Sequence, residues 1–117
     1  MKEFMMIFVG ADYADLGLSP EELQHRMGKW FAWDNKMQAA GINRGGNALN
    51  PQIRRIVGEN RTVTDLTSAE VKEIIGGYYV VLAKDFDEVE AIAQDFPDYD
   101  LGGTVEIREI TVFEDHQ

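Results

Sequence analysis

Two histidines and several carboxylates are the side chains of this sequence that could transfer a proton. His25 falls inside a predicted helix, about 160° around that helix from the centre of its apolar face, which predicts exposure to solvent. His116 lies next to the C-terminus. Because the two histidines share no helical or hairpin ligand spacing, we expect no metal site.

Asp34 interrupts the apolar stripe of the same predicted helix. That stripe consists of Leu23, Met27, Trp30, Phe31 and Met37. An unpaired buried carboxylate is costly, so Asp34 must find a partner or bind a proton. One interpretation is a structural pair with Arg54, Arg55 or Arg61, or with a backbone donor, and this is the one we favour. The other is a cavity acid with a raised pKa suited to proton transfer.

A polar group is predicted in the loop that precedes a glycine pair at residues 76–77. It contains Asp65, Glu70 and Lys72. Loop charges are usually just solvated, but functional side chains also concentrate in loops held by a rigid scaffold. These three residues are therefore candidates for ligand binding.

Charged and apolar residues alternate on the last predicted strand, where Glu106 and Arg108 lie between apolar neighbours. This pattern is typical of a solvated edge strand, and the alternative is that both charges line a cavity between two sheets. The glycine pairs of the sequence fit neither a phosphate loop nor a dinucleotide fingerprint, and they indicate turns and bulges. No histidine is well placed as an axial heme ligand, so we expect no cofactor.

Periodicity and capping signals predict the elements that position these residues. The predicted strands cover residues 4–9, 53–57, 61–64, 78–83 and 104–113, and the predicted helices run from about 20 to 40 and from 86 to 97. Ser19 and Asp85 are the expected N-caps. The order β-α-β-β-α-β with an antiparallel sheet is that of a ferredoxin-like α+β fold, in a single domain over residues 1–117.

The first strand and the strand at 78–83 are apolar on both faces. Two helices can cover only one face of a four-stranded sheet. The uncovered face would leave a large apolar patch in water, which monomers rarely tolerate. A second copy of the same sheet about a two-fold axis would cover it, so we expect a homodimer. The alternative is a chance group of apolar residues near a sheet end.

Composition limits the classes of partner. The 117 residues include 11 basic and 21 acidic side chains, a formal net charge of −10. Such a surface repels nucleic acid and anionic membranes, so we expect neither as a partner. Cysteine is absent, which excludes disulfides and thiolate metal sites. The short apolar run near the start is unlike a leader or a membrane span, so we expect a cytoplasmic protein.

The order and spacing of several motifs resemble the YCII-related family, and in particular its DGPF subgroup. The matching segments are residues 18–22, Trp33, Gly41, residues 45–46, Leu49, and residues 63–65, 69–73, 75–79, 85–97 and 102–108. The similarity covers about residues 4–112. Where the subgroup has Asp-Gly-Pro-Phe, this sequence has Asp65-Leu66-Thr67-Ser68. Because the turn-forming Gly and Pro are replaced, we expect residues 65–75 to be the least ordered internal stretch.

The resemblance implies a dimeric α/β barrel and a site in a cleft. Relatives have a suggested His/Asp pair there, with the histidine early in the first helix, where His25 lies. Subgroup members are often encoded beside alternative sigma factors, which implies signalling or stress response.

We expect the protein to bind a small organic ligand in a cleft of the homodimer, with cofactor-independent acid–base chemistry as a further step. The alternative is a non-catalytic interaction module that acts through its dimer surface. The catalytic candidates are Asp34, His25 and Asp65, and the ligand-binding candidates are Asp34, Asp65, Glu70, Lys72 and Arg108.

Overall fold

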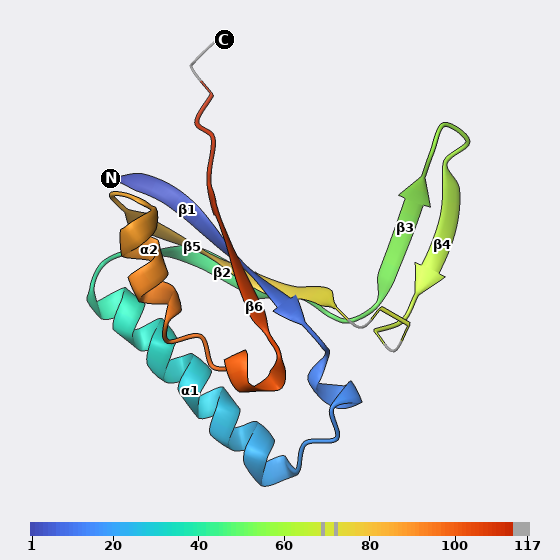
Figure 1. The fold of residues 1–117 in the computed structure, drawn as a ribbon, viewed down its shortest axis with the longest axis horizontal. Helices are drawn as coiled ribbons and strands as arrows, with labels where there is room; N and C mark the ends of the chain where they lie inside the picture. The colour runs from blue at the N-terminus through green and yellow to red at the C-terminus, as the bar shows by residue number, and fades with distance from the viewer. Residues whose placement is uncertain (69, 72, 114–117) are drawn as a thin grey trace.

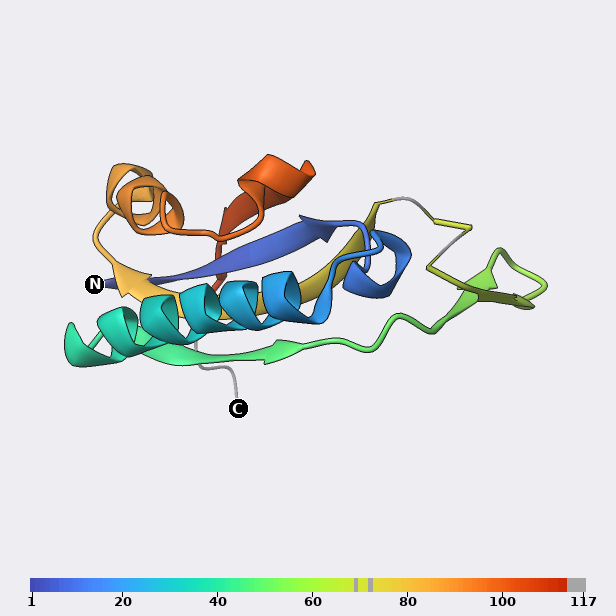
Figure 2. The ribbon, with the colours of Figure 1, turned by 90° about the horizontal axis from the view of Figure 1, so that it is seen from below.

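An antiparallel sheet with two helices against it forms the body of the protein, and a hairpin projects away from that body (Figures 1 and 2). The computed structural model describes residues 1–68, 70–71 and 73–113. The strands are β1 (Lys2–Gly10), β2 (Asn43–Ala48), β3 (Ile53–Val57), β4 (Thr62–Leu66), β5 (Ile74–Ala83) and β6 (Thr104–Glu109). The helices are α1 (Pro20–Ala39) and α2 (Phe86–Ala93), with short 3-10 turns η1 (Tyr13–Asp15) and η2 (Tyr99–Leu101).

The main sheet has the strand order β2-β5-β1-β6, and every neighbouring pair in it is antiparallel. With a helix after β1 and another after β5, this arrangement is consistent with the expected ferredoxin-like α+β fold. No helix in the described part of the chain is both long enough and apolar enough to span a membrane.

The identity of the second strand of the sheet corrects the sequence-based expectation. That strand is β2, with the sequence NRGGNA, and not the strand expected at residues 53–57. The hairpin β3–β4 instead forms a separate two-stranded sheet. No periodic hydropathy signal marks β2 because its residues are polar or small. Its pairing with β5 comes from backbone hydrogen bonds, which leave no hydropathy pattern.

Both helices begin where local capping signals place them. The Ser19 hydroxyl accepts a hydrogen bond from the Glu22 N–H at 3.1 Å, and the Asp85 carboxylate accepts one from the Glu88 N–H at 3.0 Å. Gly41 follows α1 with φ +72°, a left-handed conformation that suits glycine after a helix end. The helix α2 ends at Ala93, a few residues earlier than expected.

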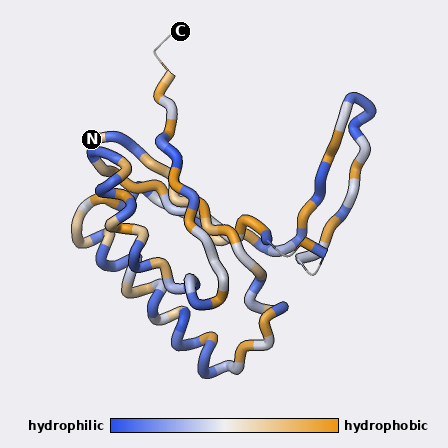
Figure 3. Tube along the Cα trace, in the orientation of Figure 1, coloured by the Kyte–Doolittle hydropathy of each residue, from blue (hydrophilic) through white to orange (hydrophobic). Residues whose placement is uncertain are grey.

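The core lies between the helices and one face of the sheet. It consists of Phe4, Met6, Phe8, Val81 and Ala83 from β1 and β5, Trp33 and Met37 from α1, Val89 and Ala93 from α2, and Phe96. The orange segments of β1 and β5 in Figure 3 mark these central apolar strands. Aromatic rings meet in this core; Phe8 stacks on Phe96 with centroids 5.2 Å apart.

The buried side of α1 differs from the predicted stripe. Phe31 belongs to the predicted stripe, but its side chain is 67% exposed. Arg26 does not belong to the predicted stripe, yet it is only 5% exposed. Residues 26, 30, 33 and 37 follow helical spacing and face the sheet. The helix is therefore rotated relative to its apolar stripe, because the charge of Arg26 is met by carboxylates from elsewhere in the chain.

The opposite face of the sheet carries a second set of apolar side chains. Met5 and Ile7 alternate with the buried residues of β1, and the register places them beside Val80 and Tyr78 of β5. All four are half-buried. On the other side of β1, Arg108 pairs with Met5 and Glu106 with Ile7. The double-sided apolar pattern of β1 and β5 is thus a property of the folded chain.

Candidate functional site

A pocket of about 440 Å³ opens between the first half of α1 and one end of the sheet. Phe8 of β1, Trp30 of α1, Tyr79 of β5 and Phe96 form its aromatic wall. Trp30 meets Phe8 edge-on at 5.1 Å between centroids, and it meets Phe96 edge-on at 5.6 Å. The wall is therefore pre-formed by mutual aromatic packing, which is worth more than area burial alone.

Two glycines allow β2 to lie close against β5 at this pocket. A Cβ on Gly77 would lie 2.7 Å from the Asn47 carbonyl oxygen, and a Cβ on Gly46 would collide with the Tyr79 ring. The register of β1 against β5 also shifts next to Gly76. The predicted role of the pair at 76–77 in a bulge is confirmed, and the bulge lies in the pocket wall.

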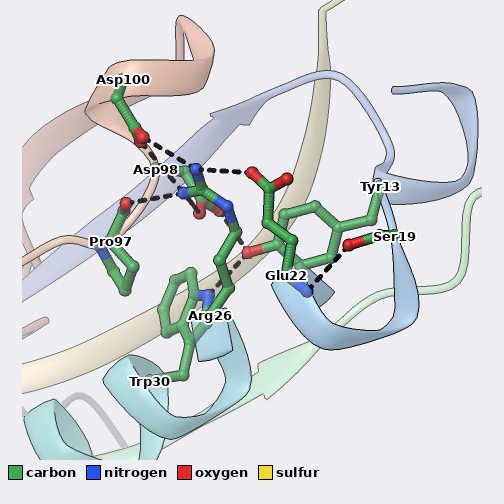
Figure 4. Close-up of polar contacts among 8 residues, drawn as sticks. All are labelled: Tyr13, Ser19, Glu22, Arg26, Trp30, Pro97, Asp98 and Asp100. Atoms are coloured by element: carbon green, nitrogen blue, oxygen red, sulfur yellow. Dashed lines mark hydrogen bonds and ion pairs between the residues drawn. The ribbon is translucent and has the colours of Figure 1, made fainter. Parts of the chain in front are cut away.

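A chain of hydrogen bonds forms the polar end of the pocket (Figure 4). The Trp30 indole N–H donates to the Tyr13 hydroxyl at 2.8 Å, and that hydroxyl donates to Asp98 Oδ2 at 2.5 Å. Arg26 Nη1 donates to Asp98 Oδ1 at 3.3 Å and to the Pro97 carbonyl oxygen at 3.1 Å. These contacts tie α1 to the loops that follow β1 and α2.

The other side of the Arg26 guanidinium is held by two more carboxylates. Asp100 accepts from Nη1 at 3.0 Å and from Nη2 at 2.7 Å, while Glu22 lies 3.5 Å from Nη2. The hydrogen bonds from Arg26 lower the pKa of Asp100, and Asp100 in turn raises the pKa of Arg26. Both groups therefore stay ionised, and the pair is a bidentate one.

Tyr13 is held in its neutral form. Burial raises the pKa of its phenol well above the ordinary value of 10.0, and the hydrogen bond to Asp98 raises it further. The phenol is thus a fixed hydrogen-bond donor to the Asp98 carboxylate. A carboxylate has about four acceptor positions, so Asp98 retains capacity for a donor supplied by a ligand.

Asp34 lies outside this pocket, and it does not have the arginine partner that the sequence suggested. Its two oxygens accept from Gln38 Nε2 at 2.9 Å and from Asn43 Nδ2 at 2.8 Å. The predicted arginines belong to the projecting hairpin β3–β4, where Arg54 binds Asp65 instead. Burial raises the pKa of Tyr79, and the nearby charge of Asp34 raises it further.

The other predicted site residues are dispersed. His25 is exposed on α1, and Arg108 is exposed on the opposite face of the sheet. Asp65 binds Arg54 across the hairpin at 2.7 and 3.2 Å, and Glu70 accepts from the Thr67 hydroxyl at 3.1 Å. Lys72 lies outside the described residues, as does residue 69 within the stretch expected to be least ordered.

Sequence reasoning missed Tyr13 and Asp98, which line the polar end of the pocket, and Arg26, which binds Asp98 from behind it. Tyr13 and Asp98 lie in loops and are 85 positions apart in the sequence. Only Arg26 left a usable signal, because it lies one helical turn before Trp30 and two turns before Trp33. In the described part of the chain, no group of three or more His, Asp or Glu residues is arranged to hold a metal ion.

The comparison with protein families gives a match over almost the whole sequence. The family model of the YCII-related domain matches residues 4–114, so the chain belongs to the YCII-related family. A comparison with curated proteins gives no match.

Proposed function

We propose that this YCII-related protein binds a small organic molecule in the pocket between α1 and the sheet. The observation that carries the proposal is a pre-formed aromatic pocket of about 440 Å³ with polar groups gathered at one end. Small-molecule sites have volumes of roughly 300–1,000 Å³, mostly apolar walls and a few placed polar groups. The aromatic wall would supply affinity, and the Tyr13–Asp98 pair would orient the ligand.

The same end of the pocket supports cofactor-independent acid–base chemistry. Asp98 is the acceptor that a ligand O–H, N–H or C–H proton would meet, and the neutral Tyr13 fixes the carboxylate from one side. Arg26 holds the other oxygen of Asp98 through a buried guanidinium. We therefore assign the base to Asp98 in place of Asp34 or His25, neither of which lines the pocket.

A thermal-shift screen of small molecules tests the pocket. A ligand at 100 times its dissociation constant adds about 2.7 kcal/mol to the free energy of unfolding, which raises Tm by several degrees. Ala48→Phe fills the pocket from β2, where Ala48 is exposed and lines the cavity. Ala91→Phe on α2 is the matched control, since Ala91 is exposed but does not line the pocket.

Genuine ligands should lose their thermal shift in the Ala48→Phe variant and keep it in the Ala91→Phe variant. If every hit stabilises both variants equally, the binding site lies elsewhere and the proposal is wrong.

We also propose that the protein is a homodimer in which the open sheet faces pack together as a dimeric α/β barrel. The support is the half-buried apolar set on that face, including Met5, Ile7 and Val80. Sedimentation equilibrium should give twice the chain mass of 13.2 kDa.

The variant Ile7→Lys should give a folded monomer, because Ile7 points away from the helices. The variant Met6→Lys should unfold the chain, because Met6 is fully buried beneath them. A wild-type protein that stays monomeric at micromolar concentration contradicts the dimer.

The projecting hairpin favours a second candidate function, a non-catalytic interaction module. On β3 and β4, Ile56, Val57 and Val63 are 63%, 53% and 57% exposed. An isolated two-stranded hairpin is at best marginally stable in water, so a partner surface would stabilise it. Shortening the hairpin to a tight turn should leave pocket ligands bound under the first function and abolish binding of the partner under the second.

We further infer that the chain is a DGPF-type member whose motif is replaced at residues 65–68.

A further inference from the structure

We propose that the pocket selects an organic cation, an ammonium group carried on an apolar or aromatic body. This inference rests on the proposed function, because it names the class of ligand for the same pocket. It follows from three properties of the site: the charge of its lining, the partial neutralisation of Asp98, and the aromatic rings of its wall.

The charged side chains that line the pocket are all acidic. Asp12 and Asp98 line it, and none of the lining residues, within the part of the chain that the structure describes, is Lys, Arg or His. An anionic ligand would therefore meet two carboxylates without a cation to bind it. Since isolated buried charges are strongly penalised, the pocket should reject carboxylates and phosphates.

Arg26 only partly neutralises Asp98. Its single positive charge is shared among Asp98, Asp100 and Glu22, which leaves this cluster with two negative charges in excess. The guanidinium makes its two shortest contacts with Asp100, at 2.7 and 3.0 Å, and a longer one of 3.3 Å with Asp98. The Asp98 side chain is 14% exposed, so solvent screens it little. An ammonium group is the complement of this carboxylate.

Aromatic rings supply the second attraction for a cation. Five aromatic side chains line the pocket: Phe8, Tyr13, Trp30, Tyr79 and Phe96. The face of an aromatic ring carries partial negative charge, which attracts a cation placed over it. A cavity that combines several rings with a carboxylate resembles the aromatic cages that bind substituted ammonium groups. The net charge of −10 would also attract a cation from solution.

Three probes of nearly equal size and different charge test the inference: 2-phenylethylamine, 2-phenylethanol and phenylacetate. We would measure binding to the wild-type protein by calorimetry and by quenching of tryptophan fluorescence, because Trp30 lies in the wall. The amine should bind about tenfold more tightly than the alcohol, a difference of about 1.4 kcal/mol. The carboxylate should bind most weakly. Added salt should weaken the binding of the amine and leave the binding of the alcohol unchanged.

The variant Asp98→Asn keeps the shape of the side chain and removes its charge, so it should bring the amine close to the alcohol in affinity. The control Glu22→Gln removes one charge from the same cluster at a residue that does not line the pocket, and it should keep the preference. If Asp98→Asn fails to fold, two measurements on the wild-type protein still test the proposal. They are the ranking of the three probes by affinity and the salt dependence of amine binding.

Equal or tighter binding of the alcohol or the carboxylate overturns the choice of a cation, and so does failure of all three probes. Binding that persists in Ala48→Phe overturns it as well, because the amine would then be held outside the pocket. The proposal that the pocket binds a small molecule is contradicted only if the wider screen yields no ligand whose binding Ala48→Phe abolishes. The two proposals can therefore fail separately.

Discussion

Replacement of Arg26 by methionine tests whether the polar end of the pocket also holds the fold together. Methionine keeps an unbranched apolar stem of similar length on the buried side of α1 and removes the guanidinium. The change leaves the buried Pro97 carbonyl without its donor and leaves Asp98 with only its hydrogen bond from Tyr13. Because the other two carboxylates are 64% and 47% exposed, water can replace the guanidinium around them.

These contacts set the expected size of the effect. Removing one partner of a buried ion pair costs about 3–5 kcal/mol, because the other charge is left buried and uncompensated. Arg26 Nε has no hydrogen-bond partner among the described residues, so part of the desolvation of Arg26 is already uncompensated in the folded protein. With one orphaned carboxylate, Asp98, we expect the lower end of the range, a loss of about 3 kcal/mol.

Urea unfolding at fixed protein concentration, followed by tryptophan fluorescence and circular dichroism, measures this loss. Lys36→Met on the same helix is the control, since the Lys36–Asp95 pair is exposed and should contribute less than about 1 kcal/mol. The double variant Arg26→Met/Asp98→Asn should be more stable than Arg26→Met alone, because it removes the orphaned charge. A single variant as stable as the control, or a double variant no better than the single, refutes the reasoning.

Three further predictions concern Tyr13, two glycines and Asp34. In an alkaline titration followed by phenolate absorbance, the Tyr13 phenol should ionise only above its ordinary pKa of 10.0. Because its pKa is raised in the folded protein, the stability that the neutral phenol contributes is lost as pH rises beyond that value. The variant Tyr13→Phe should remove the absorbance change that Tyr13 contributes at high pH. In thermal unfolding, Gly28→Ala in α1 should stabilise the protein by roughly 0.8–1 kcal/mol, because the added Cβ meets nothing within 4 Å. Gly46→Ala should destabilise the protein, because its Cβ would collide with the Tyr79 ring. The reverse order of stability would contradict the packing at β2. Asp34→Asn should change the free energy of unfolding by less than about 1 kcal/mol, because an amide oxygen can still accept from Asn43; a larger loss in chemical unfolding would show that the charge itself matters.

Interactions between near neighbours made much of the fold predictable. The cap at Ser19 joins residues three apart, and so does the cap at Asp85, so both helix starts can be read locally. The β3–β4 hairpin turns at Gly58, where φ is +79°, within the interval 58–60 left between the two strands predicted for it. The alternation in β1 indicated two apolar faces because side chains of a strand point to opposite sides in turn.

Tertiary contacts decided what local patterns could not. The pairing of β2 depends on β5, whose paired residues lie 29 to 38 positions away in the sequence, and the side chains of β2 carry no hydropathy signal. The rotation of α1 depends on Arg26 finding Asp98 and Asp100, which are 72 and 74 positions away. With Arg26 turned inward, Phe31 is left exposed.

The sequence by itself indicated both helices, every strand except β2, the two apolar faces of β1 and β5, and the acidic net charge. It did not determine the site, because the pocket takes its wall from α1, both central strands and the segment after α2, and its polar end from residues 85 positions apart. A hydrogen bond between such distant side chains forms only when the intervening chain is folded, since closing the long loop has an entropic cost that the rest of the core must offset. Packing alone therefore decided that Asp98 and Tyr13 line the pocket and that Asp34 and His25 do not.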